Sequence, residues 1–210
     1  MGKLYYLIGK SSTGKDTIFN ALLEDRDLRL QKLIQYSTRP IRDHETEGVQ
    51  YHFIDETRRK ALEEAGKIIE QRDYHTVHGL WSYMMVDDGA VDLSGSQDYI
   101  AVGTAESFQK VRDYFGEERV IPIQIEVETG ERLYRAILRE RNSNNPKYAE
   151  MCRRFLADEA DFSDENLKKA GLMDESGERR NLVWNNDREE CVAEIRKLIE
   201  KDRKARGKRK

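Results

Sequence analysis

The sequence predicts an α/β fold of three layers, in which helices flank a parallel core sheet. Three apolar runs have the length and composition of buried strands: residues 4–8, 99–102 and 120–127. Segments predicted as helices follow each of them: residues 15–24, 105–115 and 131–142. Strands that alternate with helices are typical of a parallel sheet. Because a chain of 210 residues buries one sizeable core, we expect a single domain with mobile sub-parts.

The other segments fit this alternation. We expect further strands at residues 30–36, 67–70, 80–86 and 182–184. We expect further helices at residues 57–66, from about 147 onward, and at 188–204, where apolar residues recur at helical spacing. The polar, proline-containing stretch 37–48 is predicted to be a surface or site segment, and 171–180 a loop.

The composition favours a globular protein with a densely charged surface, since 38% of the residues are hydrophobic and 37% are charged. No apolar stretch approaches a bilayer span, and the first residues lack the pattern of a secretory signal. Tyr6 occupies the position where N-myristoylation needs Ser or Thr. We therefore expect a cytoplasmic protein without membrane partners. Cys152 and Cys191 are far apart and have no Cys-x-x-Cys partner, which favours reduced structural thiols over a disulfide or a zinc site.

The last ten residues are strongly basic: Lys201, Arg203, Lys204, Arg206, Lys208, Arg209 and Lys210. Such a tail could bind nucleic acid or an anionic surface. No aromatic residue is interleaved with the charges, so we expect a frayed, solvated terminus and no nucleic-acid partner.

A phosphate-binding loop is predicted between the first strand and the first helix. Residues 9–15 read Gly-Lys-Ser-Ser-Thr-Gly-Lys, which is the G-x4-G-K part of a Walker A motif. Glycines let the backbone wrap around phosphate oxygens, and the following helix adds the positive end of its dipole. The alternative is a glycine-containing turn with a surface lysine. The residues expected to bind ATP here are Gly9, Ser11, Ser12, Thr13, Gly14, Lys15, Asp16 and Thr17.

Asp16 stands where the usual loop has the Ser or Thr that contacts magnesium, and Thr17 comes one position later. Asp16 could hold a magnesium-bound water, but we favour a role in the first helical turn, where a negative side chain is stabilised. Thr17 is the expected Mg²⁺ ligand, partly through water.

A second phosphate site is predicted in the segment Ser37–Phe53. Arg39 and Arg42 are planar cations that can hold a phosphate through two hydrogen bonds each, and Tyr51 adds a neutral donor. The alternative is a solvated loop with local Arg–Glu pairs, which contribute little to stability.

Together with the phosphate loop, this segment resembles the acceptor site of the guanylate kinases, with its Thr-Arg-x-Pro-Arg-x-x-Glu-x-x-Gly-x-x-Tyr-x-Phe pattern. The resemblance implies ATP-dependent phosphorylation of GMP and dGMP to GDP and dGDP, with Mg²⁺ accompanying ATP. It also implies a P-loop fold with a small acceptor-binding subdomain and a helical lid. The implied partners are the small molecules ATP and GMP, and the oligomeric state is left open.

The resemblance assigns roles to single residues. Glu70 matches the carboxylate that accepts hydrogen bonds from guanine; otherwise it is a surface strand residue. Arg135, Arg139 and Arg154 match the lid arginines, with Arg153 as an alternative to Arg154, while Arg132 and Arg141 are expected to be solvated. Asn185 matches the residue beside the adenine of ATP. The implied GMP-binding residues are Gln35, Ser37, Arg39, Arg42, Glu45, Tyr51, Glu70, Tyr83 and Thr104.

The implied division of the single domain 1–210 has four parts: a core of residues 1–35, 92–128 and 159–204, an acceptor-binding region 36–91, a lid 129–158 and a basic tail 205–210. Three positions depart from the family pattern. Gln35 stands in place of Ser, 78–83 in place of Gly-x-Tyr-Tyr-Gly, and 100–104 lacks an Asp. Two alternatives therefore stay open: a kinase for another monophosphate or small phosphoryl acceptor, and a non-catalytic binding module.

Overall fold

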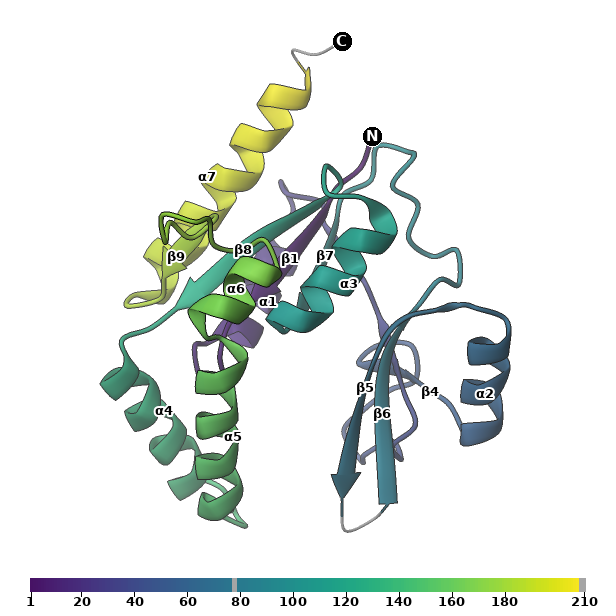
Figure 1. The fold of residues 1–210 in the computed structure, drawn as a ribbon, viewed down its shortest axis with the longest axis vertical. Helices are drawn as coiled ribbons and strands as arrows, with labels where there is room; N and C mark the ends of the chain where they lie inside the picture. Colours follow the sequence, from purple (N-terminus) through teal and green to yellow (C-terminus); the bar gives the residue numbers. More distant parts are fainter. Residues whose placement is uncertain (77–78, 208–210) are drawn as a thin grey trace.

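The computed structural model describes residues 1–76 and 79–207, and its core is a parallel sheet (Figure 1). This sheet has five strands in the order β2-β7-β1-β8-β9, and every strand pair in it is parallel. Its strands are β1 (Leu4–Ile8), β2 (Gln31–Lys32), β7 (Tyr99–Gly103), β8 (Val120–Glu126) and β9 (Leu182–Trp184). The predicted parallel core sheet is confirmed.

Helices cover both faces of this sheet because successive side chains of a strand point to opposite sides. The flanking helices are α1 (Lys15–Glu24), α3 (Ala105–Phe115), α6 (Asp164–Lys169) and α7 (Arg188–Gly207). On β1, Leu4, Tyr6 and Ile8 pack into a core that α3 and α6 complete. Tyr5 and Leu7 pack into a second core with α1 and α7. The result is the predicted three-layer arrangement.

A second, mixed sheet has the strand order β4-β3-β6-β5. Its strands are β3 (Gln35–Ser37), β4 (Tyr51–Phe53), β5 (Ile68–Thr76) and β6 (Gly79–Val86). β3 and β4 are parallel, whereas β6 runs antiparallel to both β3 and β5. Helix α2 (Glu56–Glu64) packs on this sheet through Leu62, which joins Met84 and Val86 in a small core.

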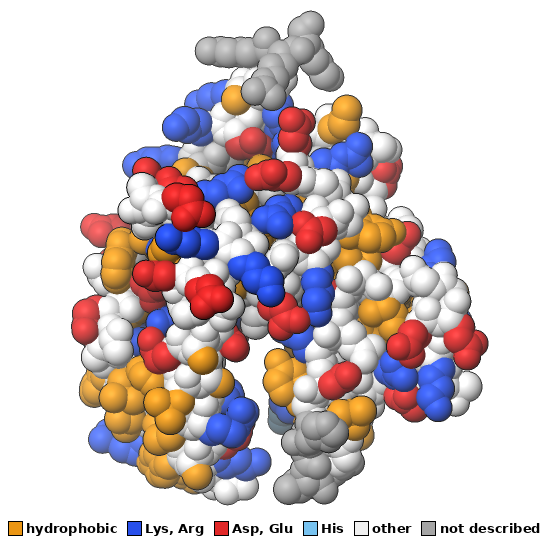
Figure 2. Space-filling view, in the orientation of Figure 1, with side chains coloured by type: hydrophobic (Ala, Val, Ile, Leu, Met, Phe, Trp, Pro, Cys, Tyr) orange, Lys and Arg blue, Asp and Glu red, His pale blue; other side chains and the backbone are white. Residues whose placement is uncertain are grey.

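Two further helices, α4 (Thr129–Arg141) and α5 (Tyr148–Asp161), extend from the core on the side opposite this second sheet (Figure 1). The space-filling view shows a cleft between the pair α4–α5 and the second sheet, with basic side chains on its walls (Figure 2). The core sheet closes the cleft at its inner end, where β1 leads into α1.

Some element boundaries differ from the prediction. The expected strand 30–36 is two short strands in different sheets, because Leu30 and Leu33 are buried in the main core while Gln35 already pairs with Tyr51 in the second sheet. The strand expected to end at Glu70 continues to Thr76, since its partner β6 pairs with it along that length. The short helix α6 was not predicted as a separate element.

The prediction of a frayed basic tail is wrong for its described part, because α7 continues to Gly207 and its arginines bind Asp98. Asp98 is 4% exposed and accepts hydrogen bonds from the Lys3 N–H at 2.8 Å, Arg203 Nε at 2.8 Å and Arg206 Nη1 at 2.9 Å. Burial opposes ionisation of this carboxyl, but the three donors hold its pKa below the ordinary value. Lys208, Arg209 and Lys210 lie outside the described residues.

Both cysteines are free: Cys152 is exposed on α5, and Cys191 is buried where α7 meets the core. Among the described helices, none combines the length and apolar character needed to cross a bilayer.

Asp98→Ala is expected to lower the free energy of unfolding by about 2 kcal/mol, because the two arginines and the Lys3 amide lose their shared acceptor. Urea unfolding followed by circular dichroism measures the change. Lys204→Ala, an exposed charge on the same helix, is the matched control and should stay within about 0.5 kcal/mol. Equal stability of both variants would show that α7 is not anchored through Asp98.

Candidate active site at the end of the core sheet

The loop between β1 and α1 needs glycine at two positions, at one because of the backbone conformation and at the other because of a close contact. Gly14 has φ +84°, and a Cβ there would lie 2.4 Å from Asn185 Nδ2. A Cβ on Gly9 would lie 2.6 Å from the Ile125 carbonyl oxygen. The loop therefore sits directly against the ends of β8 and β9, and these contacts require its two Walker glycines.

Polar groups hold the loop from inside. Thr13 is fully buried, and its Oγ1 donates to the Lys10 carbonyl oxygen at 2.9 Å. Asn185, 5% exposed and just after β9, donates from Nδ2 to the Thr13 carbonyl oxygen at 2.8 Å. The amide of Asn185 therefore contacts the loop backbone, and its assignment to the adenine of ATP stays a prediction. Ser12 has φ +66°, and its buried Oγ has no hydrogen-bond partner among the described residues.

Lys15 begins α1 and is half-buried at the inner end of the cleft. Burial lowers the pKa of its ammonium group, while Asp16 and Asp158 oppose that shift. Asp16 and Thr17 are exposed in the first turn of α1, where the negative charge of Asp16 complements the helix dipole. The structure thus gives a cation and two oxygen-bearing side chains at the mouth of the loop.

Three predicted lid arginines come from α4 and α5. Arg135 donates from Nη2 to the Asn185 carbonyl oxygen at 3.0 Å, so it touches the residue that supports the loop. Arg139 and Arg154 both lie near Glu140, at 3.8 and 3.7 Å. Both also lower the pKa of Lys15 through their positive charge. The structure therefore gathers these cations around one end of the cleft.

The prediction that Arg132 is solvated is wrong. Arg132 is fully buried, with its guanidinium carbon 3.7 Å from the centre of the Phe155 ring. It forms ion pairs with Asp158, at 3.3 Å, and with Glu159. A basic helical face usually points to solvent, and no local pattern marked the one arginine that turns inward between α4 and α5. Arg141 is exposed, as expected, and Arg153 is exposed and paired with Glu150.

On the other side of the cleft, Arg39 is 4% exposed and pairs with Glu45 through both terminal nitrogens. Its guanidinium also lies over the rings of Tyr51 and Phe53, at 5.2 and 5.1 Å. The local Arg–Glu pair that the sequence left as an alternative is thus present at Arg39. Arg39 lowers the pKa of Glu45 to about 2, mainly through this hydrogen bond. Arg42, in contrast, is exposed.

An aromatic cluster surrounds this ion pair. The Tyr51 and Tyr83 rings meet edge to face at 5.5 Å, and Tyr83 meets Tyr74 in the same way at 5.6 Å. Ser37 is fully buried opposite Tyr83 on the neighbouring strand, and its Oγ accepts a hydrogen bond from the Arg39 N–H at 3.3 Å. The structure therefore brings Arg39 and Tyr51 of the predicted second phosphate site together, whereas Arg42 meets Glu45 through its backbone N–H and its side chain is exposed.

Glu70 and Gln35 meet at a residue that the sequence analysis missed, Arg72. Its Nη2 donates to Glu70 Oε1 at 3.2 Å and to Gln35 Oε1 at 3.4 Å. Gln35 also donates to the Val102 carbonyl oxygen at 3.4 Å. Glu70 is 2% exposed, so it is not the surface residue that the alternative described. The usable signal was the spacing, since residues two apart on a strand share one face.

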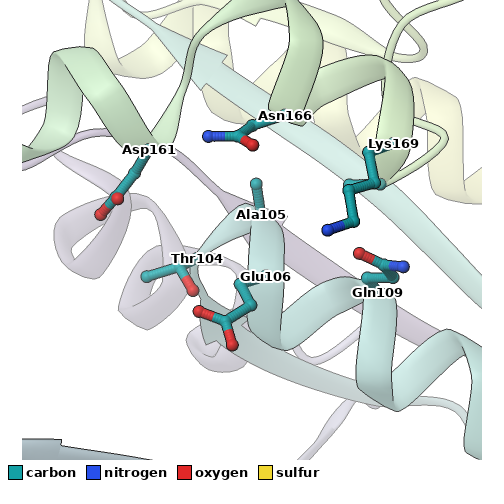
Figure 3. Close-up of a pocket in the computed structure, with 8 residues that line it drawn as sticks. Thr104, Ala105, Glu106, Gln109, Asp161, Asn166 and Lys169 are labelled. Atoms are coloured by element: carbon teal, nitrogen blue, oxygen red, sulfur yellow. The ribbon is translucent and has the colours of Figure 1, made fainter.

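Thr104 directly precedes α3 and caps its amino-terminal end. Its Oγ1 accepts a hydrogen bond from the Ser107 N–H at 3.2 Å. In turn, the Thr104 N–H donates to Ser107 Oγ at 2.9 Å. A polar pocket of about 270 Å³ opens beside it between α3 and α6 (Figure 3). Figure 3 shows Asn166 and Lys169 of α6 facing Glu106 and Gln109 of α3 across this pocket.

The amino-terminal part of the chain has recognisable relatives. The guanylate kinase family model matches residues 1–80. The guanylate kinase of Aromatoleum aromaticum is 35% identical over 105 residues, which cover 46% of this chain and 51% of the relative. That of Mycobacterium tuberculosis is 37% identical over 75 residues, 36% of either chain. The chain thus matches about half or less of the length of these curated relatives.

The similarity in fold covers more of the chain than the similarity in sequence. The crystal structure of guanylate kinase from Anaplasma phagocytophilum matches with a TM-score of 0.63 and covers 96% of this chain and 86% of its own, at 20% identity. At that identity the match concerns the fold. The chain is similar to the guanylate kinases, in sequence through its first 80 residues and in fold along nearly its whole length.

Proposed function

We propose that this chain transfers the γ-phosphoryl group of ATP to GMP or dGMP. The observation that carries the proposal is the loop at the end of β1, whose glycines, buried threonine and following helix form an anion-binding turn with Lys15 at its mouth. Across the cleft stand Arg39, Arg42 and the tyrosines of the second sheet. The proposal keeps the cytoplasmic location and the small-molecule partners expected from the sequence.

The same proposal gives the parts of the chain their roles. The second sheet and its loops, residues 36–91, would bind the acceptor, and 129–158 would form the lid. The lid arginines would disperse the charge of the migrating phosphoryl group together with Lys15. The attacking oxygen belongs to a phosphate that is already anionic at neutral pH, so the residues act by positioning and charge neutralisation and no general base is needed.

Mg²⁺ fits the residues at the mouth of the loop. Asp16 and Thr17 offer a carboxylate and a hydroxyl in exposed positions on the first turn of α1. No group of three or more His, Cys, Asp or Glu in the described part of the chain forms a metal cage. This donor set suits an ion that keeps several waters and binds mainly to nucleotide phosphates. When bound, Mg²⁺ would neutralise phosphate charge.

On the acceptor side, Arg42 is exposed and able to take a phosphate, whereas Arg39 already holds the carboxylate of Glu45. A phosphate in this site would either use the Arg39 Nε, which has no partner among the described residues, or replace Glu45. Tyr51 lies within reach of the same guanidinium. Arg39 is then both a phosphate ligand and the anchor of its own loop.

The base of the acceptor is assigned to Glu70. Its Oε2 is buried and has no hydrogen-bond partner within the described residues. Burial raises the pKa of this carboxyl, and the nearby charge of Arg72 only partly offsets the effect. An unpartnered buried acceptor is costly for the empty protein. The N1–H and amino group of guanine are donors that could satisfy it, whereas adenine has no N1–H.

Arg72 keeps a second candidate open, a kinase for a different monophosphate. It adds a cation between the two residues assigned to the base, Gln35 and Glu70. A cation there can donate to a ring carbonyl oxygen, which guanine and uracil both carry. The choice between acceptor bases therefore needs a direct comparison.

Lys15→Ala is expected to lower kcat by about 10³ while the protein stays folded, because the variant loses the cation that contacts the outer phosphates. Release of ADP in a coupled assay with ATP and GMP measures turnover, and circular dichroism measures folding. Lys60→Ala, an exposed lysine on α2, is the control and should keep wild-type turnover. Normal turnover in Lys15→Ala would rule out this active site.

Glu70→Gln is expected to stabilise the protein at neutral pH by about 1 kcal/mol, since it removes a buried carboxylate. A carboxyl whose pKa rises on folding stabilises the folded state below its ordinary pKa of 4.5 and loses that contribution as pH rises through the folded value. The difference in the free energy of unfolding between variant and wild type should therefore increase above about pH 4.5 and then become constant. Urea unfolding at several pH values measures it.

The same variant should raise KM for GMP about tenfold, because a neutral amide accepts more weakly than a carboxylate. Glu64→Gln, an exposed carboxylate on α2, is the matched control for both measurements. A variant that is less stable at every pH, with unchanged KM, would contradict the assignment of Glu70.

A panel of GMP, dGMP, AMP, UMP, CMP and dTMP in the coupled assay tests the acceptor, and we expect GMP and dGMP to be the best substrates. Arg72→Ala should raise KM for GMP about tenfold with little change in kcat, because it releases both Gln35 and Glu70. Arg26→Ala, an exposed arginine after α1, is the control. A preference for UMP or another monophosphate would leave the proposed ATP site unchanged but would contradict GMP as the acceptor.

A further inference from the structure

A carboxylate from α5 accepts a hydrogen bond from a backbone N–H of the phosphate loop. The Ser11 N–H donates to Asp158 Oδ2 at 2.7 Å, across 147 residues of sequence. Ser11 lies inside the G-x4-G-K loop, whose amides are the groups that bind phosphate oxygens in such a turn. One of the loop's anion-binding donors is therefore engaged by an anion that belongs to the protein itself.

Asp158 is held in this position by buried Arg132. The Arg132 side chain is 1% exposed and pairs with Asp158 at 3.3 Å, while the Phe155 ring covers the guanidinium. Glu159 makes a parallel connection: it pairs with Arg132 and accepts from Lys10 Nζ at 2.8 Å. Two consecutive carboxylates of α5 thus contact two consecutive residues of the loop. The contact of Asp158 with the loop is fixed by buried partners and does not depend on a freely moving surface side chain.

The charge of Asp158 also reaches Lys15, whose ammonium it stabilises. A phosphate that entered the loop would meet this negative charge and would need the same amide. A carboxylate and a phosphate oxygen are alternative acceptors for a single N–H. A phosphate oxygen that takes the Ser11 N–H therefore displaces the Asp158 carboxylate.

We propose that Asp158 is an internal competitor of the donor nucleotide and thereby sets its affinity for the loop. On binding, the Ser11 N–H exchanges the Asp158 carboxylate for a phosphate oxygen, and Asp158 keeps its ion pair with Arg132. Because Asp158 belongs to the helix that carries Arg154, the exchange removes one of the two contacts between α5 and the loop, and the Glu159–Lys10 pair remains. The inference rests on the proposed function in one respect, namely that the loop binds nucleotide phosphates.

The test is calorimetric titration of ATP, and separately of inorganic tripolyphosphate, into wild-type protein and into Asp158→Asn and Asp158→Ala, without acceptor. Both variants remove the competing charge, and the expected result is a Kd about tenfold lower for both ligands. Tripolyphosphate carries no base, so an equal gain with both ligands assigns the effect to the phosphate position. Asp161→Asn is the control: it removes an exposed charge one turn along α5 and should change either Kd by less than about twofold.

Loss of the buried pair could instead disturb the packing of α4 on α5. Thermal unfolding identifies such a variant, and Arg132→Met with Asp158→Leu then replaces both charges by apolar side chains of similar size. This double variant should also bind ATP and tripolyphosphate more tightly.

The binding results distinguish failure of the Asp158 proposal from failure of the proposed function. Unchanged or weaker binding in folded Asp158 variants, with normal binding by the wild type, would overturn this inference alone. An equal gain in Asp161→Asn would also overturn it, because the effect would then be general electrostatics. If neither the wild type nor any variant binds ATP or tripolyphosphate, the proposed function fails together with it.

Discussion

The close contact between the phosphate loop and the ends of β8 and β9 is the constraint on which the rest of the site depends. Gly9 faces the last residues of β8, Gly14 faces Asn185 after β9, and no Cβ fits at either position. The Asn185 amide then holds the Thr13 carbonyl from the same side. Because the loop is shaped by strands that pair in parallel with one another, the core sheet determines where its amides point.

Several arginines in and beside the cleft are paired with a carboxylate of the protein. Arg39 holds Glu45, Arg72 holds Glu70, and Arg132 holds Asp158 and Glu159. These pairs neutralise groups that would otherwise lie buried and uncompensated. A phosphate that enters the cleft therefore competes with internal carboxylates. Under the proposed function, the affinity for ATP and for the acceptor would be set by the difference between the two sets of contacts.

The pairs differ in how completely the carboxylate of each is hydrogen-bonded. Glu45 accepts from Arg39 and from the Arg42 N–H, so its pKa is strongly lowered and it orders its own loop. Glu70 shares one contact with Arg72 but leaves an oxygen unpartnered, and its pKa is raised. A protein under no demand to bind a ligand there would gain stability by filling the position with a neutral side chain.

The sequence by itself determined the core elements and the phosphate loop, because apolar periodicity and the Walker glycines are local signals. It also indicated which arginines could matter on α4 and α5. The tertiary structure decided which charges are buried: Arg132 between two helices, Arg72 beside Glu70, and Asp98 under the end of α7. The physical reason is that the spacing of residues on a helix or strand predicts a shared face. Whether that face meets solvent or a distant carboxylate depends on how elements far apart in the sequence pack together.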